Sequence, residues 1–224
     1  MKWMIRTGST PAERARLRVV YAMAGTVFFM PVNLFIMEGF FIIALGLGLY
    51  YCKKYPKLPL RQSPLSLPAV GFALVAFLSL VGSPHFLLGT AFYAFTVLQY
   101  LVLYFGILLF VRHSWERRLL FSTLLLSAFV VALYGLYQYA HMLTLHEAEW
   151  VDNSAFPMLR RRMYLTLYNP NLLSAFLLII MSAAASMMIC TCHRWHYVMY
   201  LAFFAILTLC LILTYSRGSW FSVC

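Results

Sequence analysis

Residues 17–51 read LRVVYAMAGTVFFMPVNLFIMEGFFIIALGLGLYY, and the topology depends on whether they form one helix or two. A single helix of this length would extend about 52 Å, whereas the hydrocarbon core of a bilayer is about 30 Å thick. Pro31, Asn33, Glu38 and Gly39 can interrupt it. Two short spans also keep the flanking basic segments on one side of the membrane. We therefore predict a helical hairpin.

The composition indicates a membrane protein. Of the 224 residues, 63% are hydrophobic and only 10% are charged, too few to cover a soluble domain of this size. The apolar runs are continuous, whereas a β-barrel shows short alternating segments. We therefore predict an all-α, polytopic transmembrane bundle whose partner is the lipid bilayer. The net charge of +11 does not imply a nucleic-acid partner, because basic residues in membrane proteins mostly set orientation.

The apolar runs predict about seven full spans and the start of an eighth, all in one membrane domain over residues 1–224. The seven runs are 17–36, 38–52, 67–82, 90–111, 119–140, 170–190 and 197–215. The eighth begins near Ser219 and stops at Cys224. A helix that ends in mid-run is not expected in a bilayer, so the chain is expected to lack a C-terminal part.

The Lys and Arg residues orient these spans. With the N-terminus in the cytoplasm, nearly all of the 17 basic residues lie inside, as the positive-inside rule predicts. Only Arg160, Arg161, Arg162 and Arg217 fall outside.

Each of these four arginines precedes a helix that starts at the outer face. Asn169-Pro170-Asn171 is typical of a helix start, with Asn as N-cap and Pro at the first position, and Ser216 could cap the helix that follows. Free N–H groups and arginine forks both favour phosphate. The pattern predicts a site for a phosphorylated ligand, although Arg160–Arg162 could instead contact lipid headgroups.

Three segments resemble the O-antigen ligase and O-antigen polymerase superfamily, mainly over residues 119–224. RMYLTLYNPNLLSAFLLIIM (162–181) is similar to the family pattern of an arginine, then Thr-Phe-x-Asn-Pro-Asn, then a helix. Leu167 stands where the family has an aromatic residue. LILTYSRGSWFSV (211–223) resembles Thr/Ser-x-Ser-Arg-Gly-x-Trp, and LYGLYQYA (133–140) resembles a helix ending in Tyr-x-x-Gln.

The resemblance implies a metal-independent, inverting glycosyltransferase without a cofactor. Such enzymes move a glycan from undecaprenyl pyrophosphate to an acceptor hydroxyl on a lipid or a growing glycan, in polysaccharide or lipopolysaccharide biosynthesis of the cell envelope. Arg162 and Arg217 match the family arginines implicated in binding the pyrophosphate. The remaining residues are expected to have supporting roles: Asn169, Asn171, Ser216, Gln138, Arg160 and Arg161.

The catalytic residue stays unknown. The family places a functional histidine in an external loop that would lie beyond Cys224, so this chain by itself is expected to be inactive. The predicted external loop 141–168 also carries ionisable residues, but a polar loop at a membrane surface needs such residues anyway. These are His141, His146, Glu147, Glu149 and Asp152.

Two other functions stay open. A transporter of a small anion such as bicarbonate would show paired ionisable groups near the bilayer midplane or broken helices in both halves. An inactive gene fragment is the other. The segment CTCHRWH holds Cys190, Cys192, His193 and His196, which could ligate zinc, but we predict no metal site because the short loop lies on the reducing side and Cys is common near helix ends.

Overall fold

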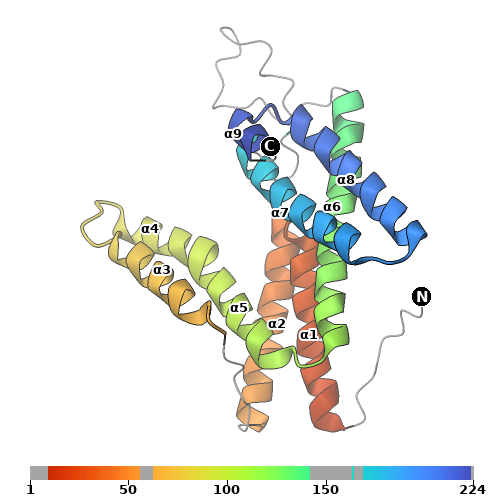
Figure 1. The fold of residues 1–224 in the computed structure, drawn as a ribbon. Coiled ribbons are helices and arrows are strands. Elements are labelled where there is room, and N and C mark those ends of the chain that lie inside the picture. The colour runs from red at the N-terminus through yellow and green to blue at the C-terminus, as the bar shows by residue number, and fades with distance from the viewer. Residues whose placement is uncertain (1–9, 56–62, 142–162, 164–168, 223–224) are drawn as a thin grey trace. The chain divides into compact units, whose positions relative to one another are not determined.

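The computed structural model describes residues 10–55, 63–141, 163 and 169–222, and in these ranges the protein is all-α, as predicted (Figure 1). The chain forms two compact units. One contains Met1–Val27 and Phe35–Ser122, and the other contains Phe28–Leu34 and Thr123–Cys224. Each unit is considered separately below.

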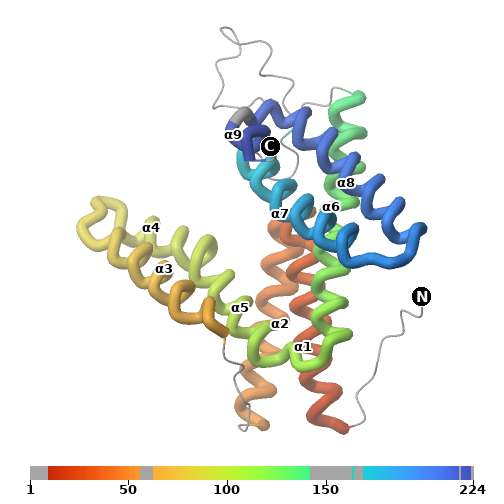
Figure 2. The backbone as a smooth tube through the Cα atoms, viewed as in Figure 1, coloured from red at the N-terminus to blue at the C-terminus, as the bar shows by residue number. Residues whose placement is uncertain are grey.

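The first unit contains five α-helices, one π-helical segment and the start of a sixth α-helix. In chain order these are α1 (Pro11–Phe29), α2 (Leu34–Lys54), α3 (Ser66–Leu78), α4 (Phe86–Tyr93), η1 (Ala94–Leu98), α5 (Gln99–Phe110) and α6 (Ser114–Ala140). The second unit holds the rest of α6 together with α7 (Pro170–Cys190), α8 (Arg194–Leu213) and α9 (Arg217–Phe221). Figure 2 shows α4, η1 and α5 as one continuous helical path.

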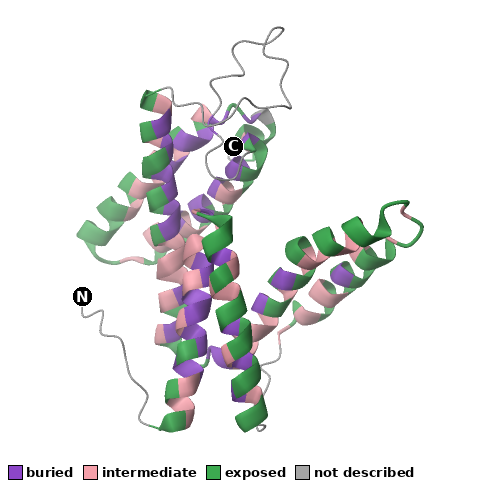
Figure 3. Cartoon of the chain, turned by 180° about the vertical axis from the view of Figure 1, so that it is seen from behind, coloured by how far each residue is buried: buried purple, intermediate pink, exposed green. Residues whose placement is uncertain are grey.

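Within the residues that the structure describes, five helices are long and apolar enough to cross a membrane, which indicates a multi-pass membrane protein. They are Leu34–Lys54, Phe86–Phe110, Ser114–Ala140, Pro170–Cys190 and Arg194–Leu213. Many large apolar side chains on them are exposed, as expected for lipid-facing surfaces, and Figure 3 shows exposed residues along α2. Helix α3 has only 13 residues. Helix α1 carries Glu13, Arg14, Arg16 and Arg18 in its first half.

The break between α1 and α2 confirms the predicted hairpin. Helix α1 ends at Phe29, whose carbonyl accepts hydrogen bonds from the amides of Val32 (3.0 Å) and Asn33 (2.9 Å). Pro31 sits in this turn, where its missing N–H and fixed φ favour a break. The expectation that Glu38 and Gly39 interrupt the helix was wrong. Both lie within α2, because the chain has already reversed at Pro31.

Helix α1 starts six residues earlier than the apolar run predicted, and a local motif accounts for this. Thr10 Oγ1 accepts a hydrogen bond from the amide of Glu13 (3.1 Å), and Pro11 is the first helical residue. This is the Thr-x-x-Glu arrangement of a capping box, combined with proline at its preferred helical position.

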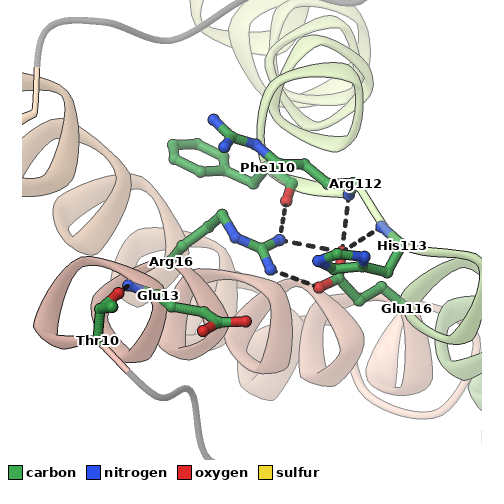
Figure 4. Close-up of polar contacts among 7 residues, drawn as sticks. All are labelled: Thr10, Glu13, Arg16, Phe110, Arg112, His113 and Glu116. Carbon is green, nitrogen blue, oxygen red and sulfur yellow. Dashed lines mark hydrogen bonds and ion pairs between the residues drawn. The ribbon is translucent and has the colours of Figure 1, made fainter.

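Arg16, inside this early extension, is buried against the start of α6 in the first unit (Figure 4). Its guanidinium donates to Glu116 Oε1 (2.6 Å), to Glu116 Oε2 (3.0 Å) and to the Phe110 carbonyl (2.6 Å). Glu116 Oε2 also accepts from the amides of Arg112 (2.7 Å) and His113 (3.0 Å). One carboxylate therefore neutralises a buried cation and occupies two backbone donors at the start of a helix.

The core of the second unit is built by α6, α7 and α8. Its largest fully buried side chains include Leu173, Leu177 and Ile180 of α7 and Leu207 of α8, and Ala128 and Ala132 of α6 lie in the same cluster. The buried residues of α7 recur every three or four positions, so one face of the helix contacts its neighbours. This core fixes the end of α7 that carries the candidate site.

Candidate functional site

The start of α7 is the first part of the candidate site. Asn169 has extended backbone angles (φ −139°, ψ 118°), and its side chain accepts a hydrogen bond from the amide of Asn171 (2.8 Å). Pro170 is the first helical residue. The predicted N-cap and proline start are therefore confirmed. Pro170 has no amide N–H, and the Leu173 amide donates to the Asn169 carbonyl (3.0 Å). This leaves the amides of Asn169 and Leu172 without an intrahelical acceptor, and these two suit an anion.

The turn between α8 and α9 is the second part. Thr214 Oγ1 donates to the Leu211 carbonyl (2.7 Å) and accepts from the Ser216 amide (3.3 Å). Tyr215 has φ 51°, in the left-handed region that commonly follows the C-terminus of a helix. The chain then restarts as a helix with Arg217 as its first residue.

Ser216 occupies the N-cap position of α9, but the expectation that its side chain caps this helix was wrong. Its hydroxyl donates instead to Asn171 Oδ1 (3.2 Å) and contacts Ser219 Oγ (3.1 Å). Capping would require the Ser216 oxygen to accept from an amide of α9, and the hydrogen bond across to Asn171 holds the hydroxyl in an orientation without that contact.

A chain of small polar side chains thus joins the starts of α7 and α9. Ser219 Oγ donates to Ser174 Oγ (2.7 Å), and Ser174 Oγ in turn donates to the Asn171 carbonyl (2.8 Å). Together with the two contacts of Ser216, this makes four contacts for the three hydroxyl protons of Ser174, Ser216 and Ser219. One of the four contacts therefore lacks a proton at any moment. The group holds together two segments 45 residues apart and keeps spare hydroxyl lone pairs for an additional donor.

Met163 also lies at the turn that follows α8. Its amide donates to the carbonyl of Leu213 (3.0 Å), the last residue of α8, and its side chain is only 3% exposed. Met163 directly follows Arg162 in the sequence. Met163, the neighbour of Arg162 in the sequence, therefore lies at the turn that leads to Arg217.

Several predicted residues lie outside the described part of the chain. These are Arg160, Arg161, Arg162, His146, Glu147, Glu149 and Asp152, together with the side chain of Arg217. Of the others, Gln138 is buried near the end of α6, and His141 is exposed just after that helix. The structure thus brings together Asn169, Asn171 and Ser216 among the predicted residues.

Ser174 and Ser219 belong to the same group but were missed at the sequence level. A usable signal exists, because each lies three residues after a predicted site residue, Asn171 or Ser216, at the start of a helix. Residues three apart on a helix share a face, so the hydroxyl of Ser174 or Ser219 lies on the same face as the predicted residue before it.

In the cysteine and histidine segment between α7 and α8, Cys190 and Cys192 are exposed. The rings of His193 and His196 pack edge to face, with their centroids 5.5 Å apart. Within the ranges that the structure describes, His, Cys, Asp and Glu residues form no group of three or more that could hold a metal ion.

Comparisons with protein-family models, curated proteins and solved structures found no match to this chain.

Proposed function

We propose that this protein takes part in glycan transfer from undecaprenyl pyrophosphate to an acceptor hydroxyl, as in an O-antigen ligase or polymerase. The proposal rests on the resemblance of residues 119–224 and on one observation above all. The hydroxyl and amide group of Asn171, Ser174, Ser216 and Ser219 joins the start of α7 to the turn that leads into Arg217.

The chemistry of the pyrophosphate-linked glycan donor explains why the starts of α7 and α9 would suit it. When the acceptor oxygen bonds to the anomeric carbon, the bond between that carbon and the pyrophosphate oxygen breaks. Both electrons leave with the pyrophosphate, and its negative charge rises. Fixed N–H groups at the start of α7 and the guanidinium groups of Arg162 and Arg217 would stabilise this charge without a metal. The acceptor proton must pass to a base that this chain does not assign.

The serine group would have a positioning role. Ser216 precedes Arg217 directly, and its hydroxyl is held by Asn171 and Ser219. Fixing the backbone on both sides of Arg217 limits the positions that the arginine can sample, which favours a defined geometry toward the donor. The spare lone pairs of the hydroxyls could accept hydrogen bonds from the glycan.

The topology that goes with this function has the N-terminus in the cytoplasm of a bacterial inner membrane, seven spans and the start of an eighth at α9. Helices α1 and α3 would then be the two spans beyond the five long apolar helices. Neutralisation of Arg16 by Glu116 removes one charge of each sign from the apolar environment of α1. The starts of α7 and α9 would face the outer leaflet.

A binding and transfer experiment tests the function. Purified protein in detergent would be titrated with farnesyl pyrophosphate, and glycan transfer would be followed from a lipid-linked donor in membranes of the producing cell. We expect Arg217→Ala to lose both binding and transfer while it still inserts, and Arg217→Lys to be impaired because it lacks the two-pronged donor fork.

Arg194→Ala is the matched control, because it removes the same charge from the exposed opposite end of α8. Farnesyl pyrophosphate binding that is equal in wild-type protein, Arg217→Ala and Arg194→Ala would reject the proposal.

A further inference from the structure

An apolar groove lies in the first unit, whereas the candidate site lies in the second. It has a volume of about 290 Å³ and is lined by side chains of α1, α2 and α5, among them Val19, Met23, Ala44 and Phe110. Every lining residue is apolar or a cysteine. No polar group is available in it to hold water, so an apolar occupant suits the groove.

Glycines make room for the groove. A Cβ atom added to Gly48 of α2 would lie 3.3 Å from the Phe110 ring, and one added to Gly106 of α5 would lie 3.0 Å from Met23 Cε. Both glycines line the groove. The depression therefore depends on absent side chains, and a larger residue at Gly48 would occupy it.

The length of the groove matches one leaflet. Its lining on α2 extends from Phe41 to Cys52, which is about 16 Å along the helix axis. This is about half of the ~30 Å hydrocarbon thickness of a bilayer. An acyl chain of one leaflet would fit this depth, whereas a spanning helix would extend well beyond it.

Among the residues that the structure describes, positive charge lies at one end of the groove. Cys52 and Phe110 lie at this end, Lys53 follows Cys52 directly, and Arg112 comes two residues after Phe110. Lys53 and Arg112 are both exposed. Lys53 is also four residues after Leu49, a lining residue, so it lies at the edge of the face of α2 that lines the groove.

Two other cations near this end are already engaged. Arg16 is buried and paired with Glu116. Lys54 Nζ contacts the Tyr50 hydroxyl (3.3 Å) and lies over the rings of Tyr50 and Tyr55. Exposed Lys and Arg residues at a membrane surface attract anionic headgroups, and Lys53 and Arg112 are placed to do so at the groove.

We propose that this groove binds one acyl chain of an anionic phospholipid whose phosphate lies between Lys53 and Arg112. The apolar lining would hold the chain, and the two cations would select the headgroup. This site is distinct from the candidate glycan-transfer site and does not depend on that function.

Native mass spectrometry of the purified full chain tests the site. The probes are phosphatidylglycerol and phosphatidylcholine with identical acyl chains, added to protein stripped of lipid by detergent exchange. We expect phosphatidylglycerol to bind about tenfold more tightly or better, since each nearby cation strengthens attraction to anionic lipid. The double variant Lys53→Gln/Arg112→Gln should lose this preference and still bind both lipids weakly.

The matched control is Arg117→Gln/Arg118→Gln, which removes two exposed cations from α6 that do not line the groove. It should keep the preference for phosphatidylglycerol. Equal binding of the two lipids by wild-type protein, or equal loss of preference in both double variants, would overturn the proposal.

A second pair of variants tests the groove itself. Gly48→Leu fills it, whereas Gly46→Leu changes an exposed glycine two residues away with no neighbouring atom within 4 Å of an added Cβ. Gly48→Leu should reduce phosphatidylglycerol binding severalfold and Gly46→Leu should not. If wild-type protein instead forms a dimer that Gly48→Leu dissociates, the groove is an interface between copies and the lipid proposal is wrong.

Discussion

The guanidinium of Arg16 and the carboxylate of Glu116, 100 residues apart, form a two-pronged ion pair in which the two side chains are 3% and 0% exposed. Removing one partner leaves the other charge buried without its counter-charge, a change that typically costs about 3–5 kcal/mol. We expect both Arg16→Gln and Glu116→Gln to be strongly destabilised. Thermal unfolding in detergent would measure this.

Arg18→Gln is the control for that pair, because Arg18 is an exposed cation two residues along the same helix and its loss should change the unfolding free energy by about 0.5 kcal/mol or less. Glu116→Gln should be at least as damaging as Arg16→Gln, since Glu116 also accepts from the amides of Arg112 and His113. Three variants of equal stability would contradict this account of the ion pair.

The capping role of Asn169 can be separated from its proposed place beside the pyrophosphate. Asn169→Asp keeps a good N-cap, whereas Asn169→Ala should cost about 1 kcal/mol of stability. The Asp variant adds a negative charge where the donor is proposed to bind. We expect it to unfold at the wild-type temperature and yet to bind farnesyl pyrophosphate at least severalfold more weakly. Unchanged binding would remove α7 from the proposed site.

The hydroxyl contact between Ser219 and Ser174 should be energetically coupled. A double-mutant cycle with Ser174→Ala and Ser219→Ala should give a coupling free energy of about 1 kcal/mol, as for a typical buried hydrogen bond. The control cycle pairs Ser174→Ala with Ser222→Ala, because the Ser222 hydroxyl donates within α9 to the Gly218 carbonyl. That cycle should give a coupling near zero. The free energies come from denaturant unfolding in mixed micelles.

The proposed orientation predicts which thiols react from outside the cell. Cys190 and Cys192 are exposed between α7 and α8, on the proposed inner side. A membrane-impermeant maleimide should label them only after the membrane is opened. A His141→Cys variant with the native cysteines replaced should react in intact cells, because His141 is exposed at the end of α6. Labelling in the opposite order would reverse the orientation and exclude an outer-leaflet site.

The all-α class and the first hairpin could be read from the sequence, because apolar length and Pro31 act locally. The true start of α1 could not, since the run of charges up to Arg18 ends the apolar pattern. Arg16 is tolerated inside the helix because it pairs with Glu116. The local apolar periodicity gives no information about a partner that lies so far along the chain. The start of α6 at Ser114, earlier than the predicted 119, has the same cause.

At the candidate site the local rules worked for Asn169 and Pro170, since capping involves neighbouring residues. They failed for Ser216, whose hydroxyl bonds across to Asn171 rather than to its own helix. A sequence pattern identifies the residues that are able to cap a helix. It does not reveal a partner on another helix, here Asn171, that holds the side chain in a different orientation once the chain has folded.

The π-helical segment η1 sets the angular relation between the two ends of the helix that runs from Phe86 to Phe110. Such a segment accommodates about one residue more than a regular α-helical turn, and each α-helical residue advances the chain by about 100°. A single deletion within Ala94–Leu98 should therefore restore uniform α-helical winding and leave the side chains of α4 and α5 in nearly the same angular relation, because the wide turn already absorbs the rotation of its extra residue.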